Sequence, residues 1–441
     1  MSEDVVVPKR AIKEINSVNG NLIVNEATVK ASNLEKMIAV SGDTRCHGDC
    51  TFEGNLKTYF LYVDDGDLEI KGNLIVERKI RVKKGRLKVD GNLISPKVEV
   101  DKSARILGEL KAEETQVGGT LVVGGSGISD YVSVGGTFES SSFEFSKISV
   151  GGTYKAYGQL SGKKISVGGT FKAEENVSVE EVDVGGTIAI QGDVISNKMN
   201  AGGTLEIQGG EVKGRLTAGG TIRSRGYLVF DRLDAGGSIT IEGGSGDKIN
   251  VGGSFVSNGN LKFNTIDVGG TVKINGDGEG HGIDVGGTVK IRGNLTLTNS
   301  FDVGGTIEVD GTLKSRSVHA GGKIQAQKIH ATNEIETNVL RTRDGAKADR
   351  IEIGKKGEVE GPLIANRVYL RDKVEAEDIY AKYAILKRNC RVRNVYADKI
   401  RIESGSLISG EIHYTDSLEA DKDVQFRVNP EKTEKLPDPP F

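Results

Sequence analysis

The sequence predicts an all-β fold, a single-stranded right-handed parallel β-helix, on three observations. Glycine supplies 61 of the 441 residues and proline only 7, without a collagen period, and aromatic residues are only 5%. The motif [V/A]-G-G-[T/S] recurs thirteen times at spacings of 16 to 18 residues. Apolar residues alternate with other residues on both sides of each glycine pair, as in short strands broken by corners.

One repeat shows how a coil is built. Val182 and Val184 alternate before the glycine pair that begins at Gly185, and Ile188 and Ile190 alternate after it. Seventeen residues accommodate three short strands and three corners, and such coils stack about 4.8 Å apart. We attribute the glycine pairs to positive φ and to close stacking of backbones. A left-handed β-helix advances in hexads, which coils of 16 to 18 residues do not keep, so the right-handed form is favoured.

The same glycine opens every copy of the motif, and we expect these positions to be structural corners. They are Gly118, Gly135, Gly151, Gly168, Gly185, Gly202, Gly219, Gly236, Gly252, Gly269, Gly286, Gly304 and Gly321.

The repeat divides the chain into five segments. Residues 1–14 are predicted to form a short N-terminal tail, and residues 429–441, with four of the seven prolines, a disordered tail. Residues 116–322 carry the Gly-Gly-Thr repeat. Residues 15–115 and 323–428 continue it with different corners, such as the recurring G-N-L. The solenoid is expected to have about 24 coils and to form one rod about 115 Å long.

The two flanking segments resemble a known family. Leu87–Lys111, LKVDGNLISPKVEVDKSARILGELK, and Ile351–Arg371, IEIGKKGEVEGPLIANRVYLR, are similar to the bactofilins, the polymer-forming cytoskeletal proteins. The resemblance implies a right-handed β-helix that polymerises end to end without nucleotide. It also implies disordered tails and, in many members, membrane binding through the N-terminal one. This chain departs from the family in its greater length and its Gly-Gly-Thr corners.

Charge and cysteine content restrict the class of partner and compartment. The net charge is −3, from 59 basic and 62 acidic residues, so no nucleic-acid partner is expected. Three cysteines in the whole chain do not make a disulfide framework and favour a reducing compartment. We recognise neither a signal peptide nor a run of 18 apolar residues. The sequence therefore predicts a cytoplasmic protein, with membrane association left open.

The best candidate for a metal site is Cys46-His47-Gly48-Asp49-Cys50. It offers two thiolates and an imidazole, whereas structural zinc requires four ligands and no second cysteine pair exists. The favoured interpretation is therefore a coil whose cysteines point inward as small apolar residues, and no metal or cofactor is expected.

No catalytic centre is expected either. The histidines after position 280 are spread over different coils, and the coils vary too little in length to carry the long loops of β-helical enzymes. They are His281, His319, His330 and His413.

Two surface features have alternative interpretations. Threonine recurs after each glycine pair, but charged residues two positions later, such as Glu139 and Lys155, favour a stacking ladder over an ice-binding plane. Residues 77–105 and 367–403 each carry ten lysines and arginines. These basic patches could meet an acidic membrane, but a solvated face that blocks lateral strand addition is favoured.

We therefore expect a structural, non-catalytic scaffold that forms a homopolymer, with an inner-membrane surface or a scaffolded protein as further partners. The alternatives are an extracellular adhesin-type β-helix and a polysaccharide-active enzyme. Terminal coils expose unpaired strand edges, so the polymer contacts should lie there. The expected contact residues are Val424, Phe426 and Val428 at one end and Ile15, Val18 and Leu22 at the other.

Overall fold

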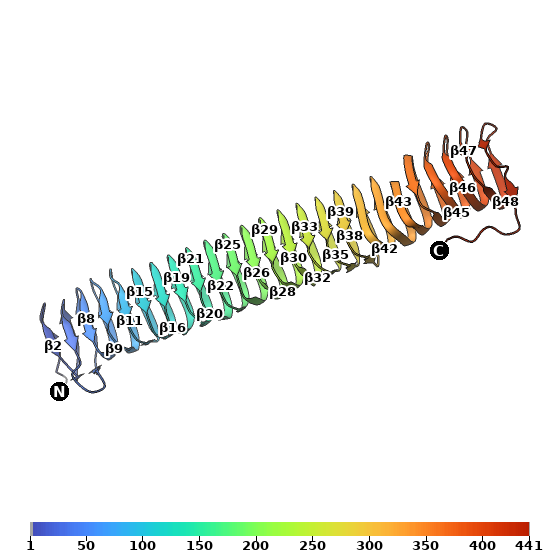
Figure 1. Ribbon diagram of the computed structural model, residues 1–441. Helices are drawn as coiled ribbons and strands as arrows, with labels where there is room; N and C mark the ends of the chain where they lie inside the picture. Colours follow the sequence, from blue (N-terminus) through green and yellow to red (C-terminus); the bar gives the residue numbers. More distant parts are fainter. Residues whose placement is uncertain (1–2, 441) are drawn as a thin grey trace. The chain divides into compact units, whose positions relative to one another are not determined.

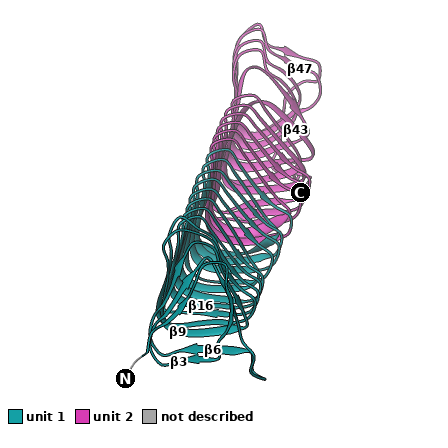
Figure 2. Cartoon of the chain, turned by 90° about the vertical axis from the view of Figure 1, so that its left-hand side faces the viewer, with its two compact units in different colours: residues 1–225 teal, residues 226–441 magenta. Residues whose placement is uncertain are grey.

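The computed structural model describes residues 3–440, which form two compact units: unit 1 ends at Arg225 and unit 2 begins at Gly226 (Figure 2). Met1, Ser2 and Phe441, which belong to the two predicted tails, lie outside the described residues. Throughout residues 3–440 the regular elements are strands, with no helix (Figure 1). Each unit is a parallel β-solenoid, and together they contain about 25 coils spaced about 17 residues apart. The predicted fold class is confirmed.

The strands of unit 1 are β1 (Val5–Val7), β2 (Ile12–Glu14), β3 (Ser17–Val18), β4 (Leu22–Asn25), β5 (Thr28–Lys30), β6 (Met37–Val40), β7 (Thr44–His47), β8 (Cys50–Glu53), β9 (Asn55–Val63), β10 (Leu68–Ile70), β11 (Leu74–Val82), β12 (Leu87–Val89), β13 (Leu93–Ile94), β14 (Lys97–Val100), β15 (Ser103–Ile106), β16 (Leu110–Val117), β17 (Thr120–Val123), β18 (Gly127–Val134), β19 (Thr137–Ser140), β20 (Phe143–Val150), β21 (Thr153–Ala156), β22 (Leu160–Val167), β23 (Thr170–Ala173), β24 (Val177–Val184), β25 (Thr187–Ile190), β26 (Asp193–Ala201), β27 (Thr204–Ile207), β28 (Gly209–Ala218) and β29 (Thr221–Ser224).

The strands of unit 2 are β30 (Tyr227–Ala235), β31 (Ser238–Ile241), β32 (Gly243–Val251), β33 (Ser254–Ser257), β34 (Leu261–Lys262), β35 (Thr265–Val268), β36 (Thr271–Ile274), β37 (Gly278–Gly280), β38 (Gly282–Val285), β39 (Thr288–Ile291), β40 (Leu295–Leu297), β41 (Ser300–Val303), β42 (Thr306–Ala320), β43 (Lys323–Glu360), β44 (Leu363–Leu370), β45 (Glu375–Leu386), β46 (Arg391–Ile402), β47 (Leu407–Ile408), β48 (Ile412–Ala420), β49 (Gln425–Phe426) and β50 (Glu431–Lys432).

A typical coil contains one long bent strand and one short strand. In β22 and β24 the first halves pair up to Gly162 and the second halves resume at Lys164, so that Lys163 sits unpaired at the bend. After the glycine corner, β23 pairs with β25 in parallel. We call the stacked first halves sheet 1, the second halves sheet 2 and the short strands after the corner sheet 3.

The core is made of stacked ladders of inward side chains. The inward set predicted from the Gly-Gly-Thr repeat is confirmed, since every member is at most 5% exposed: Val182, Val184, Ile188, Ile190, Ile222, Ile239, Ile241, Val272, Ile274, Val289 and Ile291. In sheet 3 of unit 1 the ladder becomes aromatic: the ring of Tyr154 stacks on Phe138 at 4.6 Å and on Phe171 at 5.3 Å. Its buried hydroxyl lies 3.1 Å from Oγ of Ser140, which satisfies both groups.

The corner glycines are explained by stacking and not by positive φ, which corrects part of our expectation. The described residues with positive φ do not include any of the thirteen corner positions. A Cβ added at Gly185 would instead lie 2.3 Å from the carbonyl oxygen of Gly168, one coil earlier. The same clash recurs at Gly135 and Gly286, at 2.0 and 2.4 Å. A side chain at this corner would therefore collide with the backbone of the neighbouring coil.

Asparagines form a ladder at another corner of the coil, where G-N recurs in the sequence. The backbone N–H of Asn73 donates to Oδ1 of Asn55, and that of Asn92 donates to Oδ1 of Asn73, each at 2.8 Å. The N–H of Glu109 continues the series on Asn92 at 2.8 Å. Side-chain carbonyls thus satisfy backbone donors that the turn leaves without a strand partner.

Both ends of the solenoid extend beyond the predicted limits. Val5–Val7 pairs with β4 and Ile12–Glu14 with β5, so the predicted N-terminal tail contributes the first coil. At the other end Glu431–Lys432 pairs with β48, inside the segment predicted to be disordered. Backbone pairing to an existing edge orders these short segments, including β2 and β50, whose local sequences are largely polar.

Candidate functional site

The N-terminal end of unit 1 exposes three strand edges. β1, β2 and β3 each pair on one side, with β4, β5 and β6, and they open sheets 2, 3 and 1 in that order. Val6 is 52% and Ile12 68% exposed on these edges. Lys13 is aligned with the buried Val29 and therefore occupies an inward position of the first coil, although its own side chain is exposed.

The structure places the contact residues predicted for this end in two different coils. Ile15 and Val18 do lie in the first coil, but they are 7% and 4% exposed and belong to its core. Leu22 lies in the second coil, where it is fully buried and paired with Val5. The groups open to a partner at this end include the backbone edges, the outward side chains of β1–β3 and the exposed side chain of Lys13.

The C-terminal end of unit 2 also exposes three edges. They are the second half of β48 (residues 417–420) in sheet 2, β49 in sheet 3 and β50 in sheet 1. The structure places all three predicted residues, Val424, Phe426 and Val428, in this last coil. Phe426 stacks beside the buried Ile408 and is half-buried, and Val428 is 48% exposed.

The two ends carry the same series of edges. Along the chain the last edges belong to sheets 2, 3 and 1, and the first edges also belong to sheets 2, 3 and 1. Because all ladders are parallel, strands of a second copy could continue each sheet without a change of direction. In sheet 3, Val392, Ile408 and Phe426 form one inward column at the C-terminal end. Lys13, Val29 and Phe52 occupy the same position of the coil at the N-terminal end.

The predicted metal candidate is divided between the two faces of its coil. Cys46 and Cys50 are 0% and 2% exposed and point into the core, whereas His47 lies on the exposed face. The thiols contact each other, and this hydrogen bond together with burial raises the pKa of Cys46. The same hydrogen bond lowers the pKa of Cys50, where it and the bonds to the backbone of Ala27 and Glu26 outweigh the opposing effect of burial. Among residues 3–440 no cluster of three ligand-type side chains is present. The interpretation of inward, core-forming cysteines is confirmed.

The histidines do not converge. His319 lies between two acids: its Nδ1 is 2.7 Å from Oδ1 of Asp302, and its Nε2 is 3.3 Å from Oε1 of Glu334. Burial lowers the pKa of His319, but the hydrogen bonds to the two carboxylates outweigh it and raise the pKa above the ordinary value. His281 contacts only the hydroxyl of Thr298 through its Nδ1, at 2.8 Å. These contacts join neighbouring coils.

The two basic patches form ion pairs across coils. In the first, Nζ of Lys79 lies 2.8 Å from Glu99, and Lys97 lies 2.7 Å from Glu114. In the second, Arg393 and Asp378 form a two-bonded pair at 2.7 and 2.9 Å. Part of the positive charge of each patch is therefore compensated locally by acids of adjacent coils.

The threonine ladder also behaves as a stacking ladder. Thr137 is aligned with Thr153, and the charged residues two positions on, Glu139 and Lys155, form an ion pair of 3.2 Å. Alternating charges of this kind hold neighbouring coils in register.

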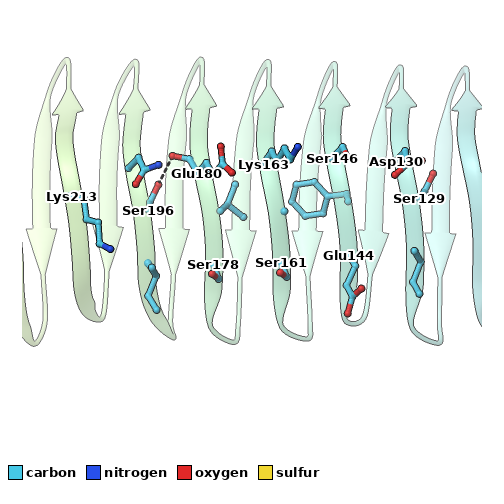
Figure 3. A pocket seen from close by; sticks show the side chains of 16 residues that line it. Ser129, Asp130, Glu144, Ser146, Ser161, Lys163, Ser178, Glu180, Ser196 and Lys213 are labelled. Atoms are coloured by element: carbon cyan, nitrogen blue, oxygen red, sulfur yellow. Dashed lines mark hydrogen bonds between the residues drawn. The ribbon is translucent and has the colours of Figure 1, made fainter.

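A shallow groove of about 520 Å³ runs along the bend of the long strands in unit 1, over β18, β20, β22, β24 and β26 (Figure 3). One column of its floor contains Glu144, Ser161 and Ser178 in register. At the ends of this column Ile128 and Ile195 are 50% and 57% exposed.

The groove in unit 1 is solvated and is lined by both polar and apolar side chains. Along its bend the labelled residues of Figure 3 include Asp130, Lys163 and Glu180, all of them exposed. Water therefore screens their charges. The hydroxyl of Ser196 donates a hydrogen bond to the backbone carbonyl of Glu180 at 3.2 Å. It thereby satisfies a carbonyl at the bend of the neighbouring strand. The acids and lysines that line the groove are all exposed to solvent.

Comparison with protein-family models, curated proteins and solved structures finds no match to this chain. No helix among residues 3–440 is long and apolar enough to cross a membrane.

Proposed function

We propose that this protein is a structural, non-catalytic scaffold, bactofilin-like in its mode of assembly, whose copies join end to end without nucleotide. The observation that carries the proposal is the series of three unpaired parallel edges at each end of the solenoid, in the same order along the chain. Unpaired edges readily accept further strands, and here one copy can supply all three.

Side chains at the two ends support such a junction. Phe426 and Val428 at one end, and Val6 and Ile12 at the other, leave apolar area exposed where an added coil would cover it. The chain after β50 does not close the end, because residues 434–439 turn back along the side of unit 2 (Figure 1). The resemblance of residues 87–111 and 351–371 to the bactofilins points in the same direction.

We further propose a cytoplasmic location and a homopolymer as the principal partner. The three cysteines, Cys46, Cys50 and Cys390, are free and buried, which suits a reducing compartment. An inner-membrane surface or a scaffolded protein would then use the sides of the solenoid.

The test is assembly of the purified full-length protein without nucleotide, observed by electron microscopy and sedimentation velocity. We expect filaments whose length grows with concentration. Phe426→Arg removes an interface anchor worth about 2 kcal/mol, which should weaken each junction more than tenfold. The variant should remain a folded monomer with unchanged circular dichroism.

The matched control is Ile195→Arg, which places the same charge on an exposed apolar residue of a lateral face. This variant should form filaments like the wild type. A wild-type protein that stays monomeric at high concentration, or normal filaments of Phe426→Arg, would refute the proposal.

A further inference from the structure

Unit 2 carries an aromatic ladder on the outward side of its sheet 1. In register, one outward column runs from Ile364 to Tyr380, Tyr396 and His413. The ring of Tyr380 lies 5.0 Å from that of Tyr396, which meets the ring of His413 edge-on at 5.5 Å. In unit 1, the column at this place in the coil contains the polar residues Glu144, Ser161 and Ser178.

The C-terminal segment of the chain lies over this ladder. After β50 the backbone N–H of Thr433 donates to the carbonyl of Tyr414 at 2.9 Å, and the chain then turns back along unit 2 (Figure 1). Residues 434–439 form one wall of a groove of about 660 Å³, whose other wall includes Ile364, Tyr380 and Tyr396. Within the segment Leu436 is half-buried.

The ladder of unit 2 is less exposed than the matching column of unit 1. Ile364 is 8% and Tyr396 7% exposed, although both stand on the outward column. Ile128 and Ile195, at the matching position in unit 1, are 50% and 57% exposed. A bare row of an isoleucine and two tyrosines would be an apolar patch of the kind that binds partners.

The segment lies on the ladder without ionic anchors. Among the described residues its acids and its lysine make no ion pair with the strand face: Lys435 pairs instead with Asp438 of the same segment, at 3.6 Å. The space of about 660 Å³ between the two walls shows that the contact is not close-packed. An occupant held in this way can be exchanged.

We propose that the aromatic ladder of unit 2 is a binding site for an extended, proline-containing peptide, and that Leu436-Pro437-Asp438-Pro439 is its intramolecular occupant. The partner class is a segment with a leucine followed by alternating prolines. This inference is independent of end-to-end assembly, because it concerns a lateral face.

The chemistry of the two walls fits this assignment. Proline fixes φ near its polyproline II value, so a proline-containing segment loses little entropy when it docks on aromatic rings. Tyrosine rings offer apolar faces to proline and keep their hydroxyls for polar contacts: the hydroxyl of Tyr396 already donates to Glu411 at 2.8 Å. Lys347 and Lys382 on the strand wall complement Glu434 and Asp438 in charge.

The experiment uses the full-length protein and a fluorescent peptide with the sequence of residues 429–441. Leu436→Asp/Pro437→Ser/Pro439→Ser releases the chain's own segment, and this variant should bind the peptide saturably. The wild type should bind it at least tenfold more weakly, because its own segment competes at an effective concentration near millimolar. A peptide with alanine in place of every proline should bind more weakly than the native sequence.

Adding Tyr380→Ser/Tyr396→Ser to the released variant should abolish binding, and Tyr380→Phe/Tyr396→Phe should preserve it. The control is Tyr383→Ser, on the same strand but in sheet 2 and 44% exposed, which should leave binding unchanged. In the otherwise wild-type chain the serine pair should accelerate tryptic cleavage after Lys435. No peptide binding by the released variant, or equal binding after loss of both rings, would overturn the proposal.

Discussion

At the corners of the coils, single glycines control how closely two backbones approach. Gly185 donates its N–H to the carbonyl of Val167 at 2.9 Å, and its α-carbon faces the carbonyl oxygen of Gly168. The requirement is for the missing Cβ and not for a special φ. Other L-residues could adopt the backbone conformation, but their Cβ would collide with the backbone carbonyl of the preceding coil.

We therefore expect Gly185→Ala to lower the free energy of unfolding by about 1–3 kcal/mol, the usual cost of forcing extra atoms into a packed site. The new Cβ would lie 2.3 Å from a backbone oxygen, which no side-chain rotation can relieve. The control is Gly282→Ala, whose Cβ would have its nearest neighbour at 3.4 Å. Urea unfolding of both variants is the measurement, and equal losses would contradict the steric explanation.

His319 gives the stability of unit 2 a pH dependence. Its pKa is raised in the folded protein by the hydrogen bonds to Asp302 and Glu334, which outweigh burial. A group whose pKa is raised on folding stabilises the folded state fully at pH values below its unfolded-state pKa, about 6.5 for histidine. That contribution is lost as the pH rises through its folded-state pKa. The urea midpoint of unfolding should therefore be higher for the wild type than for His319→Gln, and this difference should be larger at pH 5.5 than at pH 8.5.

The carboxylates provide the control for this prediction. Asp302→Asn/Glu334→Gln keeps the imidazole but removes the negative charge of both carboxylates beside it. Replacing His319 in that background should have the same effect at both pH values. A pH-dependent difference that survives there would mean that other groups cause it.

The interior strands could be predicted from the sequence, whereas the terminal ones could not. The 17-residue period and the alternation around Val182 and Ile188 repeat so often that both the register and the inward face follow. In β2 a lysine, Lys13, occupies an inward position, so the strand lacks the alternation of apolar residues by which strands are predicted. Residues 434–439 lie across a groove from Tyr396, a residue of an earlier coil, and no local signal in the sequence predicts that placement.

Lys13 should limit how tightly the first coil accepts a partner. It is aligned with the buried Val29, so a coil added beyond β2 would have to cover its ammonium group or displace it. Charged residues at such positions are a known protection of strand edges.

If copies join as we propose, Lys13→Val should raise the association constant of the junction by about tenfold, equivalent to about 1.4 kcal/mol. The critical concentration for filaments, measured by sedimentation, should fall accordingly. Lys13→Arg keeps the charge and should assemble like the wild type. Unchanged assembly of Lys13→Val would place the junction elsewhere.

For the molecule as a whole, the order of the free edges fixes the expected geometry of a junction. Sheets 2, 3 and 1 end at residues 417–420, β49 and β50, and the same sheets begin at β1, β2 and β3. A head-to-tail contact continues every sheet, and its repetition produces an open filament as long as the rotation between copies does not close a ring. A two-fold contact would instead oppose two identical ends and would reverse the strands.

Engineered cysteines distinguish these geometries. Column by column, head-to-tail stacking places Gln425 of one copy beside Ile12 of the next, both at outward positions. Adjacent strands lie about 4.8 Å apart, within the Cα range of about 4.4–6.8 Å that a disulfide spans. Ile12→Cys/Gln425→Cys should therefore oxidise to a ladder of covalent oligomers on a non-reducing gel. The native cysteines should not interfere, because all three are buried.

The pattern across variants decides the geometry. Val6→Cys/Glu419→Cys joins two positions of sheet 2 and should give the same ladder, since Leu418 and Ala420 continue the inward columns that Val5 and Val7 begin. Val6→Cys/Gln425→Cys joins different sheets and should remain uncrosslinked. Gln425→Cys alone should form no crosslink under the same oxidation and should run as a monomer on the non-reducing gel. If it forms dimers as efficiently as the paired variants form ladders, identical ends meet, and the junction is two-fold instead of head-to-tail.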